Sequence, residues 1–133
     1  MIYTFEEELR PRVHAFFEDQ RFEVFDEARL LSRNIDIIAM RRRELRTIEM
    51  KVHDWKRAIE QAYLNLRVAD YSYIALPEPV WVRASPYIKN EAYTSGIGVI
   101  GVDGVARQVI KPARSSRIQT HLRQRFVEKL RAG

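Results

Sequence analysis

The sequence predicts an α/β domain in which a mixed central β-sheet is flanked by helices. The first observation is the order of the patterns: a helical stripe, three strand-like segments, a helix, a strand, a connection, a hairpin and a last helix. The second is composition, because 133 residues with 46% hydrophobic and 31% charged side chains suit one globular unit with a modest core. We find no linker, repeat or low-complexity stretch, so we expect a single domain over residues 1–133.

Cysteine content and charge narrow the class of protein. A chain without cysteine forms no disulfide and no thiolate zinc site. Together with the lack of a signal peptide, this favours the cytoplasm, and no apolar run is long enough to span a bilayer. The net charge of +5 and the isoelectric point near 9.7 are compatible with a polyanionic partner, most often nucleic acid, and equally with an ordinary soluble basic protein.

The first segment, residues 3–20, is predicted to be a helix. Thr4 suits its N-cap, and the acidic residues that follow suit the positive end of the helix dipole. The apolar stripe consists of Phe5, Leu9, Val13 and Phe16. Pro11 either kinks this helix or indicates that the helix starts later.

The remaining elements follow in order. Residues 22–25 have strand character, and "RNIDIIAMR" and "ELRTIEMKV" form an antiparallel hairpin around Arg42-Arg43. Asp54 caps a helix, and "YSYIALP" is a short strand ended by Pro77. Residues 82–95 are ambiguous and are expected to be a loop with a short helix. Asp103-Gly104 marks a second hairpin, and Ser115 or Ser116 starts a C-terminal helix with one apolar face.

The stretch "GIGVIG", residues 96–101, matches the pattern G-x-G-x-x-G. A dinucleotide-binding site requires that this pattern follow a strand and open a helix. Here it leads into a hairpin turn instead. We therefore interpret these glycines as strand and turn residues and exclude a nucleotide site.

The first hairpin carries the candidate chemistry. Strand alternation sends Glu49 and Lys51 to one face of the sheet. If the turn contains an even number of residues, paired positions sum to 85, so Asp36 lies opposite Glu49 with Cβ atoms roughly 4.5–5.5 Å apart. The same register places Ile37 against Ile48 and Ile35 against Met50. Because Arg-Arg is not a favoured two-residue turn, a four-residue loop is preferred, which leaves the sum unchanged.

Two carboxylates held side by side repel each other unless a cation lies between them. Oxygen ligands suit Mg²⁺ or Mn²⁺, and such an ion assists deprotonation of water and polarises a phosphoryl oxygen. Lys51 could contact the attacking water or neutralise charge that grows on phosphate. These groups would serve phosphodiester hydrolysis. Considered alone, however, Glu-x-Lys is more often an ordinary ion pair on a solvated sheet face.

The combination of "NID" with "EMK", thirteen residues from acid to acid, resembles the signature of the PD-(D/E)XK nuclease superfamily. Its restriction-endonuclease-like core has the order helix, three strands, helix, strand, and the resemblance covers roughly residues 4–77. It implies a metal-dependent nuclease acting on nucleic acid, most simply DNA, with Mg²⁺ or Mn²⁺ as cofactor. The small size is similar to Holliday-junction resolvases and recombination nucleases, and a homodimer follows only by that analogy.

When the functional residues of the family are matched to this sequence by position, the resemblance implies that Asp36 and Glu49 bind the metal and that Lys51 is the catalytic lysine. Some branches add a glutamate from the first helix, for which we choose Glu6 over Glu7 and Glu8 because it precedes Leu9 by three residues and shares its flank with Arg10. Others add a glutamine in the helix after the motif, which matches Gln61. The tyrosine that follows that glutamine is replaced by Asn65, and the proline of the motif is replaced by Ile35.

Two other functions stay open. One is a nucleic-acid-binding module of the same fold that does not cleave, and the other is a subunit of a larger nucleoprotein assembly. Residues 107–131 carry eight Lys and Arg side chains against one acid, Glu128, which favours contact with phosphates over a merely solvated helix. The intact Asp36, Glu49 and Lys51 favour the nuclease.

Overall fold

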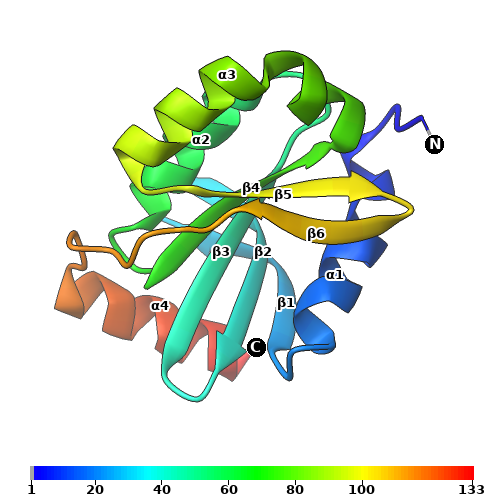
Figure 1. Ribbon diagram of the computed structural model, residues 1–133. Coiled ribbons are helices and arrows are strands. Elements are labelled where there is room, and N and C mark those ends of the chain that lie inside the picture. Colours follow the sequence, from blue (N-terminus) through cyan, green and yellow to red (C-terminus); the bar gives the residue numbers. More distant parts are fainter. Residues whose placement is uncertain (1) are drawn as a thin grey trace.

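A computed structural model gives the structure of the chain and describes residues 2–133. It is a mixed α/β fold with one six-stranded sheet, in the order β1-β2-β3-β4-β5-β6. The first three strands are antiparallel neighbours, β4 and β5 run parallel to β3, and β6 is antiparallel to β5 (Figure 1). The strands are β1 (Glu23–Leu30), β2 (Arg33–Arg41), β3 (Glu44–Met50), β4 (Tyr71–Pro77), β5 (Gly98–Asp103) and β6 (Val105–Ile110).

Four α-helices and one 3-10 turn complete the structure. They are η1 (Glu6–Glu8), α1 (Arg10–Glu18), α2 (Trp55–Asn65), α3 (Glu78–Ser95) and α4 (Thr120–Ala132). The parallel pairs β3–β4 and β4–β5 are joined by α2 and α3, as parallel strands require a crossover. Within residues 2–133 no helix has both the length and the apolar character that a bilayer span needs.

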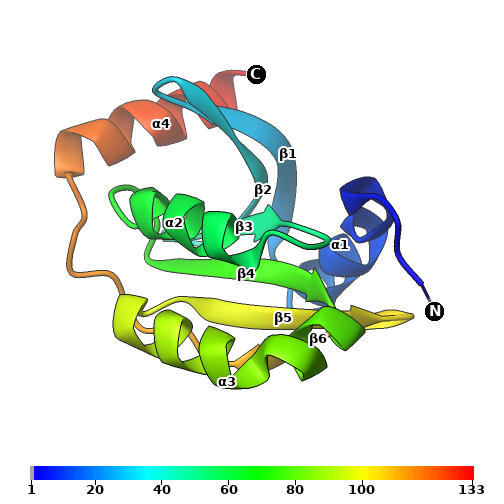
Figure 2. The same cartoon turned by 90° about the horizontal axis from the view of Figure 1, so that it is seen from above.

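The sheet separates the core into two unequal layers (Figure 2). On one face α1 packs over Ile48 and Tyr73. On the other face α2 and α3 pack over Ile74, and α4 packs over Ile38 and Leu45 of the first hairpin. Successive strand residues point to opposite faces, which is why Tyr73 and Ile74 belong to different clusters. Three helices therefore cover one face and a single helix covers part of the other.

The first α-helix starts after the acidic residues Glu6–Glu8, which form a separate 3-10 turn. Glu8 accepts hydrogen bonds from the backbone N–H groups of Thr4 and Phe5, which fixes the 3-10 turn, and α1 begins at Arg10 with Pro11 in its first turn. The expected Thr4 cap and the position of Phe5 in the core stripe are therefore wrong, because Phe5 is 69% exposed. The buried stripe is Leu9, Val13 and Phe17, and Phe16 is only half-buried.

The segment expected to be a loop with a short helix is the 18-residue helix α3. Pro79 lies in its first turn, where a missing N–H costs nothing, and Pro86 lies inside the helix. Packing of Val80, Trp81, Ile88 and Ala92 against the sheet outweighs the penalty of the internal proline. Gly96, with φ of +74°, ends the helix in the left-handed conformation.

The C-terminal helix also starts later than predicted, at Thr120 rather than Ser115 or Ser116. Ser115 is held in the preceding extended segment, because its N–H donates to the carbonyl of Asp70 and its hydroxyl donates to that of Leu66. Tertiary hydrogen bonds here replace the helical ones that the local sequence would allow.

The glycine pattern at residues 96–101 runs from a helix into a strand, so the exclusion of a nucleotide fingerprint is confirmed. Gly98 itself has a packing role. A Cβ added there would lie 2.7 Å from Cδ2 of the buried Tyr73 and 2.9 Å from Cδ of Pro112. Only glycine allows this close approach of β5 to its neighbours.

We expect Gly98→Ala to lower the free energy of unfolding by about 1–3 kcal/mol, because the new methyl group overpacks a rigid contact. Gly101→Ala is the matched control on the same strand, since its Cβ would meet Val109 at an ordinary 3.5 Å. Urea denaturation of both variants measures the difference. Equal stabilities would show that Tyr73 moves aside freely.

Candidate metal-binding active site

The first hairpin brings the two candidate metal ligands together. β2 and β3 pair Ile37 with Ile48, so the predicted sum of 85 is confirmed. The turn has two residues rather than four: Arg41 pairs with Glu44, and Arg42 takes a left-handed φ of 58°. The preference for a longer loop is thus wrong, because Arg42 accepts a conformation usually left to glycine or asparagine.

Asp36 and Glu49 occupy the next positions in this register. Beyond Ile37–Ile48 the backbone ladder stops, and Oδ2 of Asp36 accepts a 2.7 Å hydrogen bond from the N–H of Met50. The two carboxyl groups are close enough for the charge of Asp36 to raise the pKa of Glu49.

The strand is irregular at this point, and one predicted pair does not form as expected. Ile35 packs in the cluster beneath α4, whereas Met50 packs in the cluster beneath α1, so they lie on different faces. On the neighbouring β1, the pairing passes from Asp26–Ile37 to Ala28–Ile35 and skips Glu27, whose φ is +47°.

Glu49 is held by a polar network on the α2 face of the sheet. Its side chain is only 2% exposed, and Nδ2 of Asn65 donates to its Oε2 at 2.7 Å. Nη1 of Arg33 lies 3.5 Å from the same oxygen, and Nη2 donates to Oδ1 of Asn65. These contacts fix the orientation of one Glu49 oxygen.

The sequence reasoning missed Arg33 and set Asn65 aside as a departure from the family pattern. A signal for Asn65 was present, because it follows Gln61 by one helical turn on the same face of α2. No local pattern identifies Arg33, which meets α2 only through the fold. Arg33 also donates to the backbone carbonyl of Gln61, whose own side-chain oxygen is buried without a hydrogen-bond partner among the described residues.

Lys51 and Glu6 lie beside this acid pair. Lys51 directly follows β3, and its N–H donates to the carbonyl of Ala75 on β4. Its amino group is 3.9 Å from Oε1 of Glu6. Of the three acidic residues of η1, Glu7 pairs with Arg10, and Glu8 binds the backbone of its own turn. Among these three, the contact to Lys51 belongs to Glu6.

The electrostatics of the acid pair follow from its burial. Burial, and then the neighbouring charge of Asp36, raise the pKa of Glu49 from 4.5 to about 7, against the lowering effect of Asn65 and Arg33. Burial likewise raises the pKa of Asp36, although the N–H of Met50 and the charge of Lys51 lower it. The site therefore favours a proton or another cation between the two acids.

The donor set fits a hard divalent cation that keeps part of its water shell. Among residues 2–133 no three His, Cys, Asp or Glu side chains are grouped to hold a metal, so the protein would supply two carboxylates, Asp36 and Glu49. Mg²⁺ is bound in this way in many sites, by one or two carboxylates with water and phosphate oxygens. A cation would also relieve the repulsion that raises both pKa values.

Comparison with solved structures identifies a protein of the same fold. No family model matches the chain, and no curated protein matches it. A solved structure of SPO1766 from Silicibacter pomeroyi, described as a protein of unknown function, is similar with a TM-score of 0.75 and 15% identity, over 99% of this chain and 87% of that one. Pyrococcus furiosus SfsA, solved in complex with Ca²⁺, matches with a TM-score of 0.46 and 14% identity, over 78% and 64%. The SPO1766 match shows a shared fold and leaves the activity open.

We expect the metal-free protein to lose stability as the pH rises from about 4.5 to 7, because the carboxyl group of Glu49 ionises in this range. Its folded pKa exceeds its unfolded value, so the folded state binds more protons in this window, and stability falls as they leave. The contribution is at most about 3 kcal/mol. Urea denaturation in EDTA at both ends of the window should show a smaller pH dependence for Glu49→Gln. Parallel losses in the two proteins would contradict this assignment.

Proposed function

We propose that the protein is a metal-dependent nuclease with a restriction-endonuclease-like core of the PD-(D/E)XK type. The order α1, β1, β2, β3, α2, β4 corresponds to the core expected of that superfamily. In support, Asp36 and Glu49 come from the two strands of the central hairpin, and Lys51 directly follows the end of β3. DNA is the proposed substrate, and the net charge of +5 is consistent with a polyanion.

A single observation carries this proposal: the carboxyl groups of Asp36 and Glu49 are buried and act on each other electrostatically, and the charge of Lys51 acts on Asp36. Two buried acids beside an amine have no evident benefit for stability, because ionised groups are costly to bury together. The arrangement is therefore better explained by a function that uses it.

In the proposed reaction Asp36 and Glu49 hold Mg²⁺ or Mn²⁺. When bound, the ion would act as a Lewis acid that polarises a phosphoryl oxygen and eases ionisation of water. The ammonium group of Lys51 would donate a hydrogen bond to the phosphate as negative charge develops there. Glu6 would keep that ammonium in place, and the contacts of Asn65 and Arg33 would keep Glu49 in its ligating orientation.

We expect Lys51→Ala to reduce metal-dependent cleavage by roughly 100-fold or more, because a preorganised donor to the developing charge is removed. The measurement is cleavage of duplex, single-stranded, flap, four-way-junction and RNA substrates with Mg²⁺ or Mn²⁺. Lys89→Ala, at an exposed position on α3, is the matched control. If the unaltered protein cuts no substrate, or Lys51→Ala cuts at its rate, the nuclease is excluded. Tight, salt-sensitive binding without cleavage would instead identify a binding module.

We also expect Mg²⁺ or Mn²⁺ to raise the melting temperature more at pH 8 than at pH 6, because protons compete for the same oxygens. The stabilisation is about 2.7 kcal/mol at a metal concentration 100 times Kd. Asp36→Asn should abolish it, whereas Glu60→Gln, an exposed acid on α2, should not. Differential scanning fluorimetry measures both. An equal metal response in Asp36→Asn would exclude Asp36 as a ligand.

A further inference from the structure

A stack of alternating arginines and aromatic rings lies on the sheet face away from Glu49. Guanidinium carbons lie 4.3 to 5.0 Å from the ring centroids along this stack. We call it the arginine–aromatic stack; its members, in order, are Arg41, Phe22, Arg46, Tyr71 and Arg114. Rings on both sides of a guanidinium fix its plane, so its N–H groups are held at the edge of the stack.

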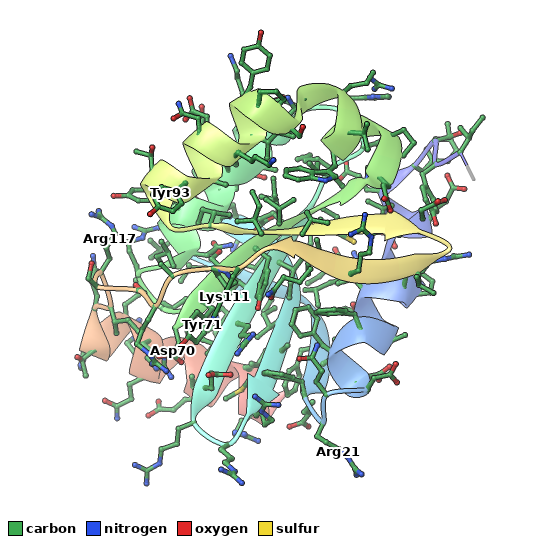
Figure 3. The ribbon with its side chains drawn as sticks, viewed as in Figure 1. Arg21, Asp70, Tyr71, Tyr93, Lys111 and Arg117 are labelled. Carbon is green, nitrogen blue, oxygen red and sulfur yellow. The ribbon has the colours of Figure 1, made fainter. Side chains whose placement is uncertain are left out.

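The stack extends from the part of the sheet that α1 covers, where Phe22 is buried against Phe17, to the part that has no covering helix. Alternation along β3 places Arg46 on the face opposite to Glu49. α4 crosses behind β3 in Figure 1, and α1 covers only one side of the near face. Figure 3 shows Tyr71 and Lys111 on this near side. The outermost arginines are open to solvent, with Arg41 42% and Arg114 63% exposed.

The charges of this region are only partly compensated. Glu44 is shared by three arginines, at 2.9 Å from Arg46, 3.8 Å from Arg41 and 4.0 Å from Arg114. Asp70 is shared by Arg114 and Arg123. Four arginines thus share two carboxylates, which leaves an excess of two positive charges.

Two other basic side chains of residues 107–131 form ion pairs with acidic residues outside the stack. Arg107 pairs with Glu78, and Arg131 lies 3.7 Å from Glu23. The expectation that this region as a whole forms a phosphate-binding helix is therefore too broad. At the stack, the excess positive charge is held by ring contacts and is open to solvent at Arg41 and Arg114.

We propose that the arginine–aromatic stack binds the phosphodiester backbone of a nucleic-acid segment that lies outside the cleavage site. The proposal rests on the proposed function for its substrate class. Planar guanidinium groups that are oriented by ring contacts and reach solvent, as those of Arg41 and Arg114 do, match phosphate oxygens. Arg46 is three residues from Glu49, about 10 Å along the strand, and points to the other face. The stack therefore cannot reach the phosphate under attack and must hold a different segment.

The test is binding of a fluorescein-labelled 30-base-pair duplex in EDTA, measured by anisotropy over a range of salt concentrations. We expect Arg41→Gln/Arg114→Gln to weaken binding roughly tenfold or more at low salt and to reduce the slope of log K against log salt by about 1.8. Arg83→Gln/Lys89→Gln, on exposed positions of α3, removes the same charge elsewhere and should change neither. Equal affinity and slope in the two double variants would overturn the proposal.

Two further measurements distinguish loss of binding at the stack from loss of the fold and from failure of the proposed nuclease function. Arg114→Gln alone, at an exposed position, should retain the fold and give about half of the change in slope. Cleavage of a short duplex that covers only the active site should be unaffected by the double variant. If the protein cleaves no substrate but Arg41→Gln/Arg114→Gln weakens binding as expected, the nuclease proposal is overturned and the binding role of the stack is supported. If the protein cleaves DNA but the double variant binds as tightly as the unaltered protein, the binding role of the stack is overturned and the nuclease proposal is supported.

Discussion

The burial of two acidic side chains against each other is the constraint on which the rest of this structure depends. Asp36 and Glu49 approach closely enough for the charge of one to raise the pKa of the other, and both are largely removed from water. Such a pair persists only where surrounding donors offset the cost. Here the N–H of Met50 serves Asp36, and the side chain of Asn65 serves Glu49. The hairpin, the crossover helix α2 and the start of β2 are all needed to supply these donors.

This requirement explains why the helix between β3 and β4 has two roles. As a crossover, α2 lets β4 run parallel to β3 and buries Ala58, Ile59 and Ala62 against the sheet. As a support, its last turn carries Asn65 to the side chain of Glu49. One short helix thus both packs against the sheet and positions a candidate metal ligand.

The sequence predicted those features that depend on local pattern. Alternation and an even turn gave the pairing of Ile37 with Ile48, and helical spacing gave α2 and the order of the core elements. Prediction from the sequence failed where contacts between residues far apart in the chain determine the structure. Residues 82–95 were expected to be a loop with a short helix, but they are helical throughout as part of α3, and packing on the sheet holds the helix together despite Pro86. Arg33 carries no local signal, because its partners lie more than 25 residues away on α2.

The skipped residue on β1 has a consequence for how molecules of this protein meet. β1 is an edge of the sheet, and an uninterrupted edge can recruit the strand of another molecule. The left-handed backbone of Glu27 breaks the regular row of donors and acceptors there, and charged Asp26 and Arg29 flank the break. Strand-by-strand polymerisation from this edge is therefore disfavoured, which protects the folded chain from templated aggregation.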